Sequence, residues 1–273
     1  MKKRIITSVI AVLVFIPFLI FSDTHAFTGA IMLLALISAL EILKCIGFGK
    51  NILVSVLCYL YTEAAVLLSR LLEISKFSMY FTFSSLVFMF MLMLVALLSH
   101  GRIPIDLIAE TFMMIFYIAI TFSCILLARD AENGGYIFML IFISAWFSDI
   151  GAYFTGMKFG RHKLIPEVSP KKTVEGAVGG IIICVVTMML YALGTQLFGN
   201  QSPKYLVFLF GGIVLSISSM IGDLLASLLK RKHKIKDYGF IFPGHGGVLD
   251  RFDSVLATAP MVIIIITLSG FYK

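Results

Sequence analysis

Apolar runs long enough to cross a bilayer recur along the whole chain, and they constrain its fold more than any other feature. A helix needs about 20 predominantly apolar residues to span about 30 Å of hydrocarbon. In lipid, backbone N–H and C=O groups must be paired within the protein, and a helix pairs them within one segment. The chain is 60% hydrophobic and only 14% charged. The sequence therefore predicts an all-α, polytopic integral membrane protein rather than a soluble domain.

We predict about nine transmembrane helices from these runs. They lie near residues 5–21, 27–46, 51–68, 77–98, 105–128, 135–150, 177–198, 204–229 and 253–271. The first follows Met1-Lys2-Lys3-Arg4 and resembles a signal peptide. Since Thr24-His25-Ala26 is a poor cleavage site and many spans follow, we expect an uncleaved anchor.

The distribution of Lys and Arg predicts the orientation of these helices. With this number of spans, one side of the membrane holds the N-terminus and the loops near 47–50, 99–104, 151–176 and 230–252. When Lys44 is counted with its adjacent loop, that side has 17 of the 22 Lys and Arg. The positive-inside rule places that side in the cytoplasm and the C-terminus outside the cell membrane. The net charge of +7 is therefore explained by topology and phosphate binding, and no nucleic-acid partner is expected.

We divide the chain by predicted role. Residues 1–100 are expected to be a scaffold of transmembrane helices, and residues 101–273 to carry the functional site with the loops 151–176 and 230–252. Four acidic residues lie in or near helices without a second ligand at motif spacing, and their roles stay open: Glu41, Glu63, Asp106 and Glu110.

The end of the eighth predicted helix carries polar residues on one face. Asp223, Ser227 and Lys230-Arg231 recur at spacings of three or four, so they share that face. If Lys230 marks the membrane interface, Asp223 lies about 10 Å deeper. An unpaired carboxylate at that depth costs about 2.5 kcal/mol or more. Asp223 therefore requires a cation or a water-filled cavity.

Two further carboxylates, Asp250 and Asp253, lie three residues apart where the last helix begins. Together with Asp223 they predict a magnesium site, since this hard ion prefers oxygen ligands. A turn with Gly244, Gly246 and Gly247 lets backbone N–H groups approach an anion. Basic side chains that would neutralise a polyphosphate and an anionic headgroup surround it: Lys230, Arg231, Lys232, Lys234, Lys236 and Arg251.

An alternative interpretation makes this region an ordinary basic loop. Asp250 and Asp253 would then cap the last helix, and Asp223 would pair with a lysine. The combination of a buried aspartate, a glycine turn and a second carboxylate pair favours a site. His245 would serve there as a phosphate contact, a proton shuttle or a structural hydrogen-bonding group, and we favour the phosphate contact.

The loop at 151–176 offers a second phosphate-binding feature. Asp149 lies at the end of the sixth predicted helix. Ser169-Pro170 predicts the start of a helix, with a hydroxyl N-cap followed by proline at the first helical position. Unpaired N–H groups beside Lys171 and Lys172 would suit a phosphate. A plain capped helix whose lysines serve only the positive-inside rule explains the same residues, and both interpretations stay open.

Three segments then resemble a known family. Ser227-Leu-Leu-Lys230-Arg231, Lys236-Asp237-Tyr-Gly239 and Phe242-Pro243-Gly-His245-Gly246-Gly247-Val-Leu-Asp250-Arg251-Phe-Asp253 are similar to the signature of the phosphatidate cytidylyltransferases, also called CDP-diacylglycerol synthases. Ser169-Pro170-Lys171-Lys172-Thr173 with Glu175-Gly176 resembles that family's second block, except that Val168 and Val174 replace the isoleucine and tryptophan expected there. The resemblance covers residues 145–260.

The resemblance implies that CTP and phosphatidate react at the bilayer to give CDP-diacylglycerol and pyrophosphate. It implies that Asp223, Asp250 and Asp253 hold Mg²⁺, with a monovalent ion such as K⁺ beside it. The expected contacts of the remaining residues are as follows: Lys236, Arg251 and Gly244–Gly247 with the triphosphate; Ser227, Lys230 and Arg231 with the lipid phosphate; Ser169, Lys171, Lys172, Thr173 and Glu175 with the nucleotide, assisted by Asp149. Asp237 would bind metal or orient Lys236.

Other functions remain as alternatives. A CTP-dependent polyprenol kinase would transfer the γ-phosphoryl group to an alcohol, and the signature argues against it. A transporter usually places its carboxylates near the midplane and contains repeats. In this sequence the polar residues instead gather at the predicted cytoplasmic interface, and no pair of repeats is found. The pattern DGxxAR…GxxxDxxxD of the CDP-alcohol phosphotransferases is absent. The oligomeric state is open, with a homodimer as one arrangement.

Overall fold

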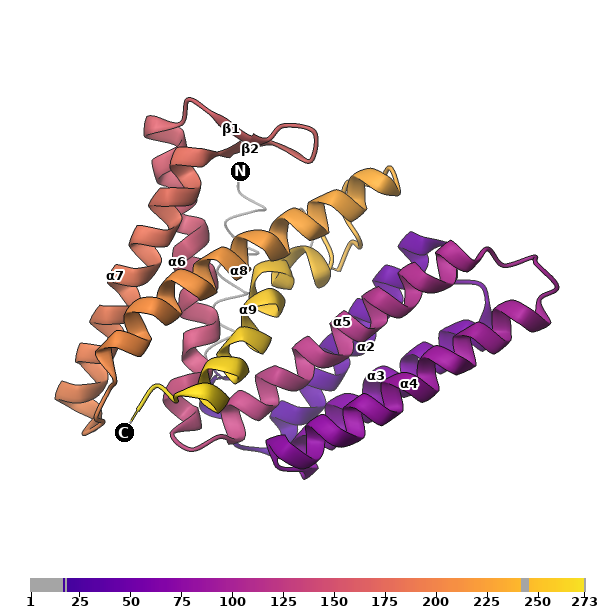
Figure 1. Ribbon diagram of the computed structural model, residues 1–273, viewed down its shortest axis with the longest axis horizontal. Helices are drawn as coiled ribbons and strands as arrows, with labels where there is room; N and C mark the ends of the chain where they lie inside the picture. Colours follow the sequence, from indigo (N-terminus) through magenta and orange to yellow (C-terminus); the bar gives the residue numbers. More distant parts are fainter. Residues whose placement is uncertain (1–16, 18, 242–245, 273) are drawn as a thin grey trace. The chain divides into compact units, whose positions relative to one another are not determined.

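The protein is a helical membrane protein, as the sequence predicts. A computed structural model describes Pro17, residues 19–241 and residues 246–272. Within these residues, 8 helices are long and apolar enough to cross a membrane (Figure 1). They are α2 His25–Ile46, α3 Ile52–Leu71, α4 Ile74–Leu98, α5 Ile105–Asp130, α6 Gly134–Phe159, α7 Val174–Gly199, α8 Tyr205–Lys232 and α9 Leu249–Leu268. The predicted first span at 5–21 lies almost entirely outside the described residues.

Several helices extend beyond their apolar runs. The prediction that the sixth helix ends at residue 150 is wrong, because α6 continues to Phe159. Likewise, α9 begins at Leu249, four residues before the apolar run near 253–271. Hydropathy marks only the part of a helix that needs lipid, whereas backbone hydrogen bonding continues until a residue such as Gly160 interrupts it. Asp149, Asp250 and Asp253 are therefore all helical residues.

The chain forms two compact units, which we describe separately. The first comprises the chain up to Leu127 together with Ile235–Arg251, and the second comprises Ala128–Lys234 together with the chain from Phe252 onward. Helices α5 and α9 each contribute residues to both units. The predicted division by role at residue 100 stays a prediction.

In the first unit, α3 packs against both α2 and α4. Tyr61 of α3 lies at the centre of the contact with α4. Its hydroxyl is 2.7 Å from the hydroxyl of Ser85, and its ring stacks on that of Phe88 with centroids 4.3 Å apart. An unpaired hydroxyl is costly in an apolar environment, so this bond supports one particular register of the two helices.

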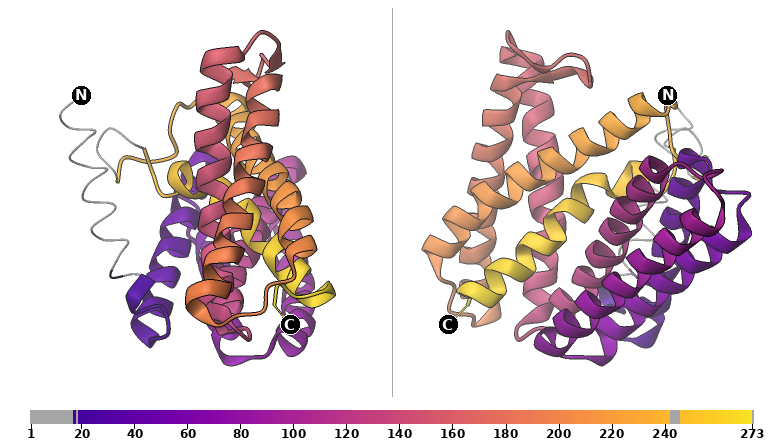
Figure 2. Two further views of the ribbon diagram at one scale, coloured as in Figure 1. Left: turned by 90° about the vertical axis from the view of Figure 1, so that its left-hand side faces the viewer. Right: turned by 45° about the vertical axis from the view of Figure 1, so that its right-hand side comes forward.

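In the second unit, α6, α7 and α8 pack against one another (Figure 2). Glycines allow the close approach of α6 and α7. A Cβ atom added at Gly151 would lie 3.1 Å from Gly179 O, and one added at Gly180 would lie 2.9 Å from Ser148 O. Small residues bring helix backbones together in membranes, where lipid supplies no hydrophobic force between helices. The α6–α7 pair thereby forms a rigid support for the polar segment that connects these helices.

That connection is a short antiparallel hairpin of β1 Lys163–Ile165 and β2 Ser169–Thr173. The prediction that Ser169-Pro170 begins a helix is wrong. Ser169 pairs with Ile165 in the hairpin, and α7 begins only at Val174. Thr173 is the N-cap, because its hydroxyl accepts a hydrogen bond from Gly176 N at 3.1 Å. The hydroxyl cap of this helix therefore lies four residues later than predicted.

Candidate functional site

A cluster of carboxylates in the second unit is built by close contact between α8 and α9. Gly222 precedes Asp223 on α8, and a Cβ atom added there would lie 2.5 Å from Asp253 O and 2.5 Å from Ala257 Cβ of α9. Because glycine leaves that space open, the two backbones touch. The carboxylates of Asp223 and Asp253 consequently interact electrostatically.

Asp149 of α6 joins this pair. Its Oδ2 accepts a hydrogen bond from Ser254 Oγ at 3.0 Å, and its charge interacts with those of Asp223 and Asp253. Asp149 is exposed, and the other two aspartates are half-buried. Three carboxylates from three helices thus lie within electrostatic range of one another. Their mutual repulsion would be relieved by a bound cation.

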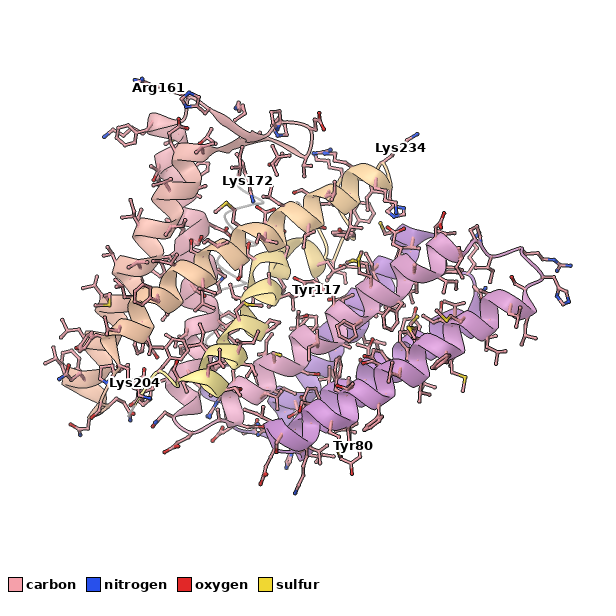
Figure 3. The ribbon with its side chains drawn as sticks, viewed as in Figure 1. Tyr80, Tyr117, Arg161, Lys172, Lys204 and Lys234 are labelled. Atoms are coloured by element: carbon pink, nitrogen blue, oxygen red, sulfur yellow. The ribbon has the colours of Figure 1, made fainter. Side chains whose placement is uncertain are left out.

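Basic side chains lie beside the same carboxylates. Lys172 extends from β2 toward α8 (Figure 3), and its Nζ is 2.7 Å from Asp223 Oδ2. Lys230 of α8 is within electrostatic range of Asp253. Ser227 Oγ is 3.5 Å from Asp223 Oδ1, so these two share the helix face that their spacing predicts. Arg231 is exposed at the end of that helix. A lysine paired with Asp223 is also what the alternative interpretation expects.

The remaining residues of the 169–175 segment have mixed positions. Lys171 is exposed and Ser169 is half-buried. The Glu175 carboxylate accepts hydrogen bonds from Arg161 N at 3.0 Å and from His162 N at 3.2 Å, and it pairs with His162 Nδ1 at 2.6 Å. Glu175 therefore closes the junction of α6 and β1. The predicted contacts of this segment with a nucleotide stay predictions.

In the first unit, Asp250 joins two described parts of the segment Ile235–Arg251. Its Oδ2 accepts hydrogen bonds from Tyr238 N at 2.7 Å and from Gly247 N at 3.0 Å. Gly246 has a φ of +87°, and a Cβ atom there would lie 2.7 Å from the same oxygen. Asp250 thus holds the turn together, but both of these N–H groups precede α9, so this bonding is not the helix cap that the alternative interpretation expects.

The other predicted residues of this segment are placed as follows. Lys236 and Arg251 are exposed, and Asp237 is half-buried. Gly244 and His245 lie outside the described residues, so the predicted anion contact of the full glycine turn stays a prediction. Asp250 belongs to the first unit, whereas Asp223 and Asp253 belong to the second.

Sequence reasoning missed two residues that contact the predicted site. Ser254 follows Asp253 directly and donates to Asp149, but a serine in an apolar run gives no signal of its own. Glu41 accepts hydrogen bonds from the backbone of Val248 and Leu249. Its charge within a membrane span is a signal of function, but the sequence gives no indication of its partners.

The oxygen ligands of the second unit fit a hard divalent cation such as Mg²⁺. This ion is often bound through one or two carboxylates, with water and substrate phosphates as the other ligands. Asp223 and Asp253 would supply the carboxylates. Among the residues that the structure describes, no group of three or more His, Cys, Asp or Glu side chains is gathered tightly enough to hold a metal ion by itself.

These features define a polytopic membrane protein with a charged, phosphate-compatible cluster at one end of its helices. A model of the cytidylyltransferase family matches residues 2–269. A phosphatidate cytidylyltransferase of Bacillus subtilis is 34% identical and covers 98% of both chains. Proteins with the same name from Staphylococcus haemolyticus and Staphylococcus aureus are 33% and 31% identical, over 97% of this chain and 99% of theirs.

The chain belongs to the cytidylyltransferase family. It is therefore a nucleotidyltransferase, as the resemblance of its signature segments implies.

Proposed function

We propose that the protein is a phosphatidate cytidylyltransferase, which converts CTP and phosphatidate into CDP-diacylglycerol and pyrophosphate. The observation that carries this proposal is the match to relatives of that name over nearly the full length of both chains. The Asp149, Asp223 and Asp253 cluster with Lys172 and Lys230 supports it, because phosphoryl chemistry depends mainly on charge neutralisation and alignment.

The proposed reaction is a displacement in line at the α-phosphorus of CTP. A phosphate oxygen of phosphatidate forms a bond to this phosphorus, the bond to the bridging oxygen of the β-phosphate breaks, and its electron pair leaves with pyrophosphate. Lys236, Arg251 and the Gly244–Gly247 turn would bind the triphosphate, with His245 as a further phosphate contact. Since the nucleophile is already an anion, alignment contributes more than a general base.

In the second unit, Ser227, Lys230 and Arg231 would bind the lipid phosphate, and Lys172 is placed to bind the nucleotide. Asp223 and Asp253 would hold Mg²⁺, with Asp250 as a further predicted ligand and K⁺ as a neighbouring ion. Such a cation would neutralise negative charge on the phosphate oxygens and on the leaving group. Asp237 would orient Lys236 or add a ligand.

We propose that this chemistry takes place at the cytoplasmic surface of the cell membrane. Lys204 and Lys234 lie at opposite ends of α8 (Figure 3). Pro203 is bridged to Tyr272, so the C-terminal residues lie at the Lys204 end, and Lys172 reaches the other half of the helix through Asp223. Lys172 and Lys234 therefore lie toward the same end of this unit, and the positive-inside rule assigns that end to the cytoplasm.

One assay tests the reaction class. Purified protein in detergent micelles with phosphatidate is given CTP labelled at either the α- or the γ-phosphorus. The proposal expects the α-label in CDP-diacylglycerol and the γ-label in pyrophosphate. Transfer of the γ-label to a polyprenol with release of CDP would instead identify a CTP-dependent kinase. Absence of both products would refute the proposed reaction.

A further inference from the structure

Glu41 lies far from the signature in sequence but contacts it directly within the first unit. This residue of α2 is only 5% exposed. Its Oε1 accepts a hydrogen bond from Val248 N at 2.9 Å, and its Oε2 accepts one from Leu249 N at 3.0 Å. Leu249 is the first residue of α9. A carboxylate from one helix thus caps the start of another.

The cap completes a continuous set of bonds through the turn. Gly247 N donates to Asp250, and the next two backbone N–H groups donate to Glu41. The first N–H groups of a helix have no partners within it and carry positive partial charge. Bonds from such groups to an ionised carboxylate are short and strong. The conformation of the chain as it enters α9 therefore depends on Glu41.

Two glycines of the signature also approach this carboxylate. A Cβ atom added at either Gly239 or Gly247 would overlap Glu41 Oε1. The same atom at Gly239 would lie 3.2 Å from Gly247 Cα, so the two sides of the segment approach each other beside Glu41. These glycines are thus required for the fit around a protein carboxylate, independently of any phosphate.

We infer that Glu41 is a positioning residue for the nucleotide-binding part of the signature. It fixes the backbone at Val248 and Leu249 and packs against Gly239 and Gly247, and it thereby sets the directions of the neighbouring Lys236 and Arg251, which we assign to the CTP triphosphate. This inference rests on the proposed function. Misplacement by about 1 Å costs about 100-fold in rate at a preorganised site, so loss of the cap is expected to weaken CTP use.

The kinetic test compares Glu41→Gln with Glu63→Gln. Glutamine offers one carbonyl oxygen where two acceptors are needed, and its NH₂ group faces a backbone N–H. Glu63 of α3 is a matched control, because it is a carboxylate in the same unit whose buried Oε1 has no hydrogen-bond partner among the described residues. We expect Glu41→Gln to lower kcat/KM for CTP at least about tenfold through a higher KM, with KM for phosphatidate unchanged.

A second variant breaks the contact without changing Glu41. The added methyl of Gly239→Ala must displace the carboxylate, so it should reproduce the rise in KM for CTP. In a Glu41→Ala background that obstacle is gone, and Gly239→Ala should then add less than about twofold. Hydrogen exchange at Val248 and Leu249 N–H, measured in detergent, should accelerate in both single variants and stay slow in Glu63→Gln.

The outcomes separate this inference from the proposed function. If the wild-type protein is active, a normal KM for CTP in Glu41→Gln overturns the positioning role. Additive effects of Glu41→Ala and Gly239→Ala in the double variant overturn it as well. Fast exchange with unchanged kinetics reduces Glu41 to a structural cap and also overturns it. Equal losses for both substrates together with a lower thermal midpoint indicate general destabilisation and also overturn the positioning role. Wild-type protein that forms no CDP-diacylglycerol refutes the proposed function instead, while exchange still reports the cap.

Discussion

Replacing Gly222 with alanine should separate the two helices that carry Asp223 and Asp253. The new Cβ atom would lie 2.5 Å from both Asp253 O and Ala257 Cβ. Non-bonded heavy atoms ordinarily lie at least about 3.5 Å apart. The helices must therefore move apart by about 1 Å at this level, because the obstructing atoms belong to backbone and to a Cβ that cannot rotate away.

The magnitude follows from this displacement. Overpacking of a well-packed contact costs about 1–3 kcal/mol of stability. Misplacement of reacting groups by about 1 Å lowers the rate about 100-fold, which corresponds to about 2.7 kcal/mol in activation free energy. Gly222→Ala should thus retain its fold and lose nearly all turnover.

The assay is the initial rate of CDP-diacylglycerol formation at matched protein concentration, with the thermal midpoint in detergent as the measure of folding. Gly194→Ala is the control, because it makes the same substitution within α7 of the same unit and its added Cβ would meet nothing within 4 Å. The control should retain full activity. Turnover of Gly222→Ala within threefold of wild type would refute the claim that this contact sets the carboxylate geometry.

Three other perturbations test the assignments separately. Asp253→Asn should remove at least about 3 kcal/mol of transition-state stabilisation in kcat/KM while expression persists, and near-normal turnover would reduce this residue to a structural role. Lys236→Gln should raise KM for CTP or abolish turnover, whereas Lys232→Gln and Lys234→Gln should cause little loss. Equal mild losses at all three would mean that these lysines only determine the topology of the loop. A cysteine introduced at position 234 should react with a membrane-impermeant reagent only from the cytoplasmic side, and labelling only from outside would contradict the proposed orientation.

The helices and their order were predictable from the sequence because hydropathy reports directly what lipid requires. The helix ends were less predictable, since they depend on backbone bonding beyond the hydrocarbon. Ser169-Pro170 has the residue types of a helix start, yet pairing of Ser169 with Ile165 commits it to a strand. Thr173 then caps α7, and nothing in the local sequence ranks one hydroxyl above the other.

The site shows the same division between local and distant contacts. Spacing along one helix places Ser227 near Asp223, as observed. The partner of Asp223 is Lys172, which is not its neighbour in sequence, and Asp149 bonds to Ser254 across 105 residues. Such pairs depend on glycines such as Gly222 that set how closely helices approach. A single sequence contains the glycine but not the identity of the helix that it faces.

The carboxylates of this protein fall into two kinds, and the difference explains what each mutation should do. Glu41 and Asp250 each accept two backbone hydrogen bonds within the first unit, so both carboxylates are held by groups of the protein itself. Asp223 and Asp253 instead interact with each other and with Asp149, and Lys172 neutralises only part of that charge. Carboxylates bonded to the backbone fix geometry, whereas charges that repel one another favour a bound cation. Substitution of the first kind should therefore change the fit of CTP, and substitution of the second kind should change the dependence of the rate on the metal concentration.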